Sequence, residues 1–268
     1  MKKMILIMMC CLLTLGCRND PQKSGNETKE FSYVWLDMYK LEGNTITLPL
    51  GDHITLNVGG INAAPEMTIE NEQVVSGKAE PKTAVSNIYT LTALEVGTTE
   101  LTFREEEIKE TWTINVVAME ISSPGISDGV IAQKYGMYGT QKKGGVPTLS
   151  IPIAIGNAPN YAVCYALVMI DPDAGNFVHW LATDFSLEDL IENASVQAAD
   201  KMIQGKNDFG KKGYGGPTPP KTHKYKITVY ALKEPLGLKP GYTYKQFKKA
   251  LADKVLVSAE MSGKYKVK

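Results

Sequence analysis

The sequence predicts a mainly β protein in which an export signal precedes two β-sandwich units that carry a few helices. Hydrophobic and polar residues alternate through most of the chain after residue 30, which is the period of strands with one buried face. Turns that contain glycine or proline separate these runs. Helix signals are confined to two short segments, one after Ser186 and one after Thr243.

The composition is that of a soluble globular protein, with 43% hydrophobic and 22% charged residues among 268. This length allows two domains. The whole chain has no net formal charge, and without residues 1–16 it has 27 basic and 29 acidic residues, a net charge of −2. We therefore expect no nucleic-acid partner and no extensive polybasic surface, although a local basic patch is compatible with this balance.

Residues 1–16 form the predicted signal peptide. A short basic start precedes an apolar run, Met4–Leu15, which is shorter than the ~20 residues of a membrane-spanning helix. The run ends at Gly16 and Cys17, an arrangement that resembles a bacterial lipoprotein signal. The resemblance implies a cell-envelope protein held to a membrane by lipid on Cys17, and Arg18 favours the outer membrane. A plain signal peptide cleaved nearby is the alternative.

Residues 17–30 are polar, and we expect them to form a flexible tether. Residues 31–117 follow with period-2 alternation, and the segment Thr92–Phe103 resembles the late strands of bacterial Ig-like domains. We expect an Ig-like β-sandwich here, serving as a spacer or adhesion module. Its histidine, His53, follows a turn and is expected to be exposed to solvent.

Residues 118–268 form the second predicted unit, again mainly β. A nearly continuous apolar segment at 161–170 predicts a strand covered on both faces, and Cys164 within it is expected to be a small buried residue. Residues 205–220 are rich in glycine and proline and predict a loop. The other predicted elements are a helix after Ser186 through Leu187, Leu190 and Ile191, a strand at 224–232, a helix from Thr243 through Phe247 and Leu251, and a strand at 255–267.

Three clusters in this unit could carry chemistry: Asp171–Ala174, His179–Trp180, and Gly213–Pro220 followed by His223. Taken singly, the first is typical of a turn, the second of a packed histidine, and the third of a stiff loop. Together they contain two of the three histidines in the chain. Imidazole and glycine backbone N–H groups can donate to an anion, and a nearby carboxylate can orient an imidazole. The combination favours an anion-binding site.

The same clusters resemble the two signatures of the phosphatidylethanolamine-binding protein family, in its bacterial Raf-kinase-inhibitor-like branch. The first signature is similar to residues 171–180, the second to residues 204–225, and weaker similarity extends from Ser122 to Tyr265. The resemblance implies a β-sandwich-like fold with a small preformed pocket for phosphate or the phosphoryl head of a phospholipid. It also implies the pocket residues by position: Asp171, His179 and His223 at the polar base, Gly216 and Pro217 in the wall, and Asp173 and Tyr225 as supports.

Three functions remain open from these residues. The leading hypothesis is a lipid-anchored binding protein for a small anionic ligand, with no catalytic residue, cofactor or metal. The second is a hydrolase or metal-dependent enzyme that uses the Asp/His cluster, although no Gly-x-Ser-x-Gly nucleophile elbow accompanies it. The third is a protein-interaction module with a vestigial pocket and an unknown partner. It is supported by Tyr135–Gly139, where the bacterial branch usually has Tyr-Thr-Cys-Asp-Gly.

Overall fold

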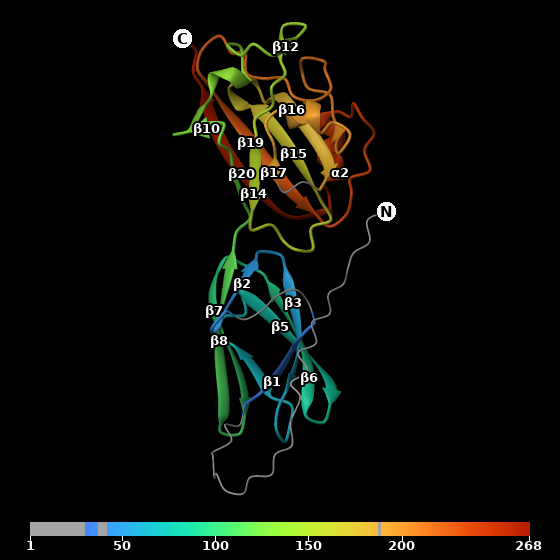
Figure 1. Cartoon of the computed structure of the whole chain (residues 1–268). Coiled ribbons are helices and arrows are strands. Elements are labelled where there is room, and N and C mark those ends of the chain that lie inside the picture. Colours follow the sequence, from blue (N-terminus) through green and yellow to red (C-terminus); the bar gives the residue numbers. More distant parts are fainter. Residues whose placement is uncertain (1–29, 37–41, 187–188) are drawn as a thin grey trace, which may run out of the picture.

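The computed structural model describes residues 30–36, 42–186 and 189–268. The predicted signal peptide, nearly all of the predicted tether and the lipid site at Cys17 lie outside the described residues. The described chain forms two β units that lie end to end (Figure 1), and each unit has a hydrophobic core of its own. The predicted mainly β class with a few helices is therefore confirmed.

The first unit is a pair of four-stranded sheets, ordered β1-β3-β6-β5 and β2-β8-β7-β4. Its strands are β1 Ser32–Trp35, β2 Thr45–Pro49, β3 His53–Gly59, β4 Glu66–Ile69, β5 Val75–Thr83, β6 Ser86–Ala93, β7 Gly97–Glu105 and β8 Ile108–Val117. Alternation places Ile54, Leu56 and Val58 of β3 in the core, where all three are fully buried. Its Ig-like assignment stays a prediction.

The second unit is built on a seven-stranded sheet ordered β10-β11-β20-β19-β15-β16-β18, with the small sheets β17-β14-β9 and β12-β13 beside it. Its strands are β9 Glu120–Ser122, β10 Ile126–Ser127, β11 Val130–Ile131, β12 Lys142–Lys143, β13 Val146–Pro147, β14 Ile153–Gly156, β15 Cys164–Asp171, β16 Phe177–Phe185, β17 Asp189–Leu190, β18 Ile203–Gln204, β19 His223–Leu232 and β20 Val255–Tyr265. Every residue of the central strand β15 is buried, as the unbroken apolar run predicts. Cys164 at its start is buried as expected.

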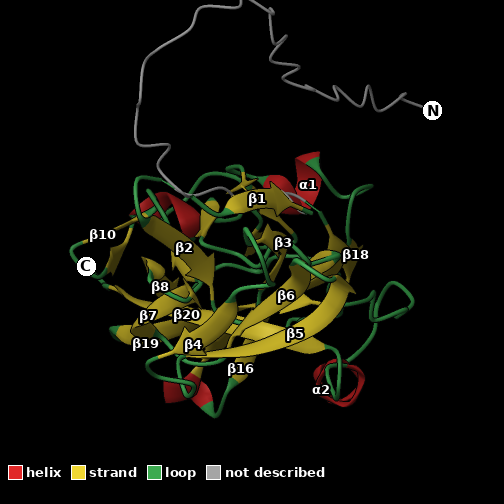
Figure 2. Ribbon diagram, turned by 90° about the horizontal axis from the view of Figure 1, so that it is seen from below, coloured by secondary structure: helices red, strands yellow, loops and turns green. Residues whose placement is uncertain are grey.

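Two α-helices lie at the periphery of the strands: α1 Ala194–Gln197 and α2 Tyr244–Ala250 (Figure 2). The predicted second helix is confirmed, and Thr243 caps it in a capping box with Gln246. The predicted helix after Ser186 is wrong at Leu190 and Ile191, and its predicted residue Leu187 lies outside the described residues. Asp189 and Leu190 instead form β17, which pairs with β14, and the short α1 begins further along the chain.

The two units meet at the turn before β3. The Asp52 carboxylate accepts a hydrogen bond from the backbone N–H of Asn160 at 2.9 Å. The His53 ring stacks on Tyr161 with ring centroids 3.7 Å apart and an interplanar angle of 16°. The expectation that His53 is exposed to solvent is therefore wrong, because a residue of the second unit covers one face of its ring.

Candidate functional site

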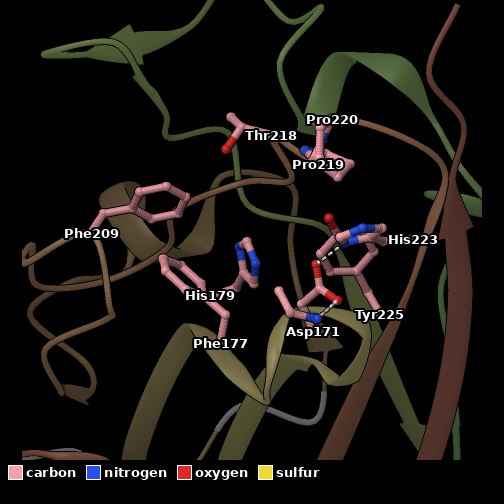
Figure 3. Close-up of a pocket in the computed structure, with 10 residues that line it drawn as sticks. Asp171, Phe177, His179, Phe209, Thr218, Pro219, Pro220, His223 and Tyr225 are labelled. Carbon is pink, nitrogen blue, oxygen red and sulfur yellow. Dashed lines mark hydrogen bonds and ion pairs between the residues drawn. The ribbon is translucent and has the colours of Figure 1, made fainter.

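A cavity of about 190 Å³ opens where β15 ends and where β16 and β19 begin. Antiparallel pairing sets this meeting point, because the last residues of β15 lie beside the first residues of both neighbours. Five of the lining side chains are polar groups or a tyrosine, and most of the others are rings (Figure 3). The lining residues are Asp171, Ala174, Phe177, His179, Phe209, Thr218, Pro219, Pro220, His223 and Tyr225.

Asp171 and His223 form a buried pair at the base of this cavity. The distance from His223 Nδ1 to Asp171 Oδ2 is 2.8 Å, and both side chains are almost fully buried. The other oxygen, Oδ1, accepts a hydrogen bond from Ala174 N at 3.1 Å and so caps the 3₁₀ turn Pro172–Ala174. The carboxylate is therefore fixed at both oxygens. It orients the imidazole and leaves Nε2 as the ring nitrogen available to a ligand.

His179 is held from the opposite side by the glycine-rich loop. Its Nδ1 donates to the Gly215 carbonyl at 2.6 Å, since a carbonyl oxygen can only accept. Gly215 N–H donates in turn to the backbone carbonyl of His179 at 2.8 Å. Figure 3 shows the His179 ring standing between the two phenylalanines and the Asp171–His223 pair. Its Nε2 is thus the second imidazole nitrogen available to a ligand.

Burial lowers the pKa of His179, because the low-dielectric surroundings disfavour the imidazolium. The hydrogen bond to Gly215 and the negative charges of Asp171 and Asp208 act in the opposite direction without reversing the shift. We therefore expect a neutral ring near pH 7. Its proton is then on Nδ1, and Nε2 presents a lone pair.

The two predicted supporting residues take different positions. Asp173 does not line the cavity; its Oδ2 accepts a hydrogen bond from Lys224 N at 2.8 Å and ties the 3₁₀ turn to the start of β19. Tyr225 does line the cavity and is 1% exposed. Its hydroxyl lies near the Asp171 carboxylate but makes no hydrogen bond of ordinary geometry to any described residue. Burial, reinforced by Asp171, raises the pKa of this phenol, which therefore remains a potential donor to a ligand.

Gly216 and Pro217 are placed differently from their predicted role as the pocket wall. Neither is among the lining residues. Gly216 N–H donates to the Pro147 carbonyl at 2.9 Å, and the Pro217 carbonyl accepts from Met137 N at 2.7 Å. Both residues therefore anchor the loop from behind, and the next three residues form the wall.

Sequence reasoning missed several lining residues. Phe177 and Phe209 contact each other with ring centroids 4.9 Å apart, and both lie close to the His179 ring. Phe209 and Pro219-Pro220 lie within the segments that resemble the second family signature, so the resemblance could have indicated them. Phe177 lies in a short return between strands, where no pattern in the sequence signals a binding role.

Known proteins resemble the chain over its second unit. The model of the phosphatidylethanolamine-binding protein family matches residues 122–266, a range that includes every residue lining the cavity. A UPF0098 protein of Pyrococcus abyssi is 32% identical over 160 residues, which cover 56% of this chain and 86% of that protein. The uncharacterised protein YxkA of Bacillus subtilis is 34% identical over 149 residues, which cover 48% and 89%.

A solved structure agrees with these sequence matches. A crystal structure of a phosphatidylethanolamine-binding protein homologue from Chlamydia trachomatis superposes with a TM-score of 0.50 at 28% identity. The superposition covers 56% of this chain and 99% of that one. The family match begins at residue 122, so the whole first unit precedes it.

Proposed function

The chain belongs to the phosphatidylethanolamine-binding protein family, and from this premise we propose that its cavity binds a small anionic ligand of the phosphoryl type. The observation that carries the proposal is the pair of imidazoles, His179 and His223. Each uses Nδ1 within the protein, at 2.6 Å and 2.8 Å, and each lines the cavity. Two oriented Nε2 atoms and the unpaired Tyr225 hydroxyl can together bind the oxygens of one phosphoryl group.

The size and the rings of the cavity narrow the ligand class. About 190 Å³ suits a headgroup rather than a whole lipid. Phe177 and Phe209 line the same space, and the face of an aromatic ring attracts an ammonium group. Phosphoethanolamine, which carries a phosphoryl group and an ammonium group, should therefore bind more tightly than phosphate.

Thermal unfolding of the protein with phosphate, phosphoethanolamine or acetate tests this proposal. A ligand at about 100 times its dissociation constant adds ~2.7 kcal/mol to the free energy of unfolding, which is a shift of several degrees for a domain of this size. We expect this shift for the phosphoryl ligands and its loss in His223→Ala. No response to any of the three anions would reject the proposal and favour the protein-interaction hypothesis.

We propose binding without catalysis. The free thiol among the described residues, Cys164, lies in a separate core cluster with Leu232 and Phe247. Burial raises its pKa to about 11, so it is a poor nucleophile. Within the described ranges, no three His, Cys, Asp or Glu side chains lie together in a way that could hold a metal ion. Both observations support a binding role for the Asp/His cluster.

We also propose that lipid on Cys17 holds the protein to a membrane of the bacterial cell envelope, with residues 31–117 as a spacer. No helix in the described part of the chain is long and apolar enough to span a membrane. Replacing Cys17 with Ala should move the protein from the detergent phase to the aqueous phase in detergent partitioning. Partitioning of Cys17→Ala into the detergent phase would contradict this mode of attachment.

A further inference from the structure

The balanced charge of the chain conceals a separation of charge between its two units. Residues 31–117 contain 5 basic and 13 acidic residues, a net charge of −8. Residues 118–268 contain 19 lysines, no arginine and 13 acidic residues, a net charge of +6. The unit that holds the cavity is therefore basic, and the position of its lysines decides whether they form a site.

One group of lysines lines a groove of about 420 Å³ over β19 and β20. Lys224 and Lys264 lie directly opposite each other in the register of these strands, and Lys266 also lines the groove. All three are exposed, and none forms an ion pair with a described residue. Asp128 lines the groove as well. Like charges directly opposite each other destabilise a sheet, so a bound anion would relieve a repulsion that the fold leaves in place.

The same strand pair shows how such a charge can be neutralised. Lys226 follows Lys224 by two residues in β19, and its Nζ lies 2.6 Å from Glu260 Oε2. Among the described residues, Asp128 lines the groove but makes no ion pair with Lys224 or Lys264, and Asp173 bonds the backbone N–H of Lys224 rather than its ammonium group. Between Lys226 and the two lysines of the groove, only the groove lysines therefore keep a positive charge that no ion pair with a described residue neutralises.

A second lysine-rich groove, of about 210 Å³, lies on the other segment that builds the cavity. Lys143, Lys211 and Lys212 line it, and no acidic residue does. Lys212 also lies opposite Lys206 in an isolated bridge of the loop. None of these lysines forms an ion pair with a residue in the described ranges. The like-charge arrangement of the first groove thus occurs a second time.

Both grooves contain residues that lie close in sequence to residues lining the cavity. Lys211 and Lys212 follow Phe209 in the loop, and Lys224 stands between His223 and Tyr225 in β19, with its side chain on the opposite face of the strand from theirs. Figure 1 shows β12, which carries Lys143, and the C-terminus beyond β20 at the end of the second unit remote from the first. The lysine grooves therefore lie on elements at the end of the second unit that is remote from the acidic unit.

We propose that these two grooves bind a linear phosphate polyanion along the end of the second unit that is remote from the first. Lysine is a compact, strongly hydrated point charge without the planar fork of arginine, so grooves whose basic residues are all lysines respond to charge density rather than to the shape of one group. An inserted membrane anchor requires exposed apolar side chains, and none of the exposed large hydrophobic residues in the described chain lines either groove. A flexible chain of phosphates has a high density of negative charge, and it needs no apolar side chain to bind.

Titration of the full chain with inorganic polyphosphate tests the proposal. We expect Lys224→Gln/Lys264→Gln to weaken binding at least tenfold, and the slope of log K against log salt to become shallower by about one for each lysine lost. Lys211→Gln/Lys212→Gln should have the same effect. The matched control is Lys245→Gln/Lys249→Gln, which removes the same charge from α2, outside both grooves. It should change the affinity for polyphosphate less than twofold.

Three further results separate this proposal from its alternatives. Groove variants that behave like the α2 control would overturn it, and so would binding to anionic phospholipid vesicles without binding to polyphosphate. His223→Ala should lose the response to orthophosphate and keep polyphosphate binding, which separates failure of the cavity from failure of the grooves. Without polyanion, Lys224→Gln/Lys264→Gln should unfold at the same or a higher temperature than the native chain, because a repulsive pair is removed.

Discussion

Gly216→Ala is expected to destabilise the second unit by about 3 kcal/mol or more and to abolish the response of the cavity to phosphate. A Cβ at this position would lie 2.1 Å from the Tyr135 carbonyl oxygen and 2.9 Å from the Pro147 side chain. The first obstacle is backbone, so no change of rotamer can relieve it. The loop must move instead, and Thr218 to Pro220, which line the cavity, follow directly after this residue.

The measurements are chemical denaturation for stability and a thermal-shift titration for binding. Gly156→Ala is the matched control, because a Cβ there meets no atom within 4 Å. We expect it to change stability by no more than about 0.5 kcal/mol. If Gly216→Ala kept both native stability and the phosphate response, the loop would not be fixed from behind as the geometry indicates.

The strands could be predicted from sequence because their burial pattern is a period-2 signal in the chain itself. β15 was predictable for a different reason, since its unbroken apolar run maps onto a strand with no exposed residue. The helix after Ser186 could not be excluded in this way. Leu190 pairs with Ile153, which is 37 positions earlier in the chain, and such a long-range contact overrides the local helix signal of a few residues.

The site was predictable in its ionisable groups and less so in its walls. Asp171 and His223 lie 52 positions apart and form a buried pair, which the family resemblance implied and spacing alone could not. Gly216 showed the limit of assigning roles by motif position, because a conformationally free residue can serve the backbone behind a pocket as well as its surface. The lysine grooves were hidden for a different reason: the net charge of a whole chain averages over two units of opposite sign.

Anion binding in the cavity is expected to take up at least one proton, at His179, so affinity should rise as pH falls. Burial lowers the pKa of His179, and its Nδ1 proton is engaged by Gly215. Near neutral pH the Nε2 atom therefore presents a lone pair, which repels an anionic oxygen. Binding requires a proton between the two atoms, either on the imidazole or on the ligand. Above the pKa of both groups, one linked proton weakens affinity about tenfold for each pH unit.

Calorimetry with sulfate at several pH values assigns that proton to the protein, because sulfate stays fully deprotonated near neutral pH. We expect the tenfold dependence in the native chain. In His179→Gln the dependence should become shallower by one linked proton, since an amide N–H can donate at any pH, and binding should persist at a lower affinity. A variant that merely disturbed the structure would weaken binding and keep the slope. An unchanged slope in His179→Gln would therefore move the proton to another group of the cavity and remove His179 from the role assigned to it.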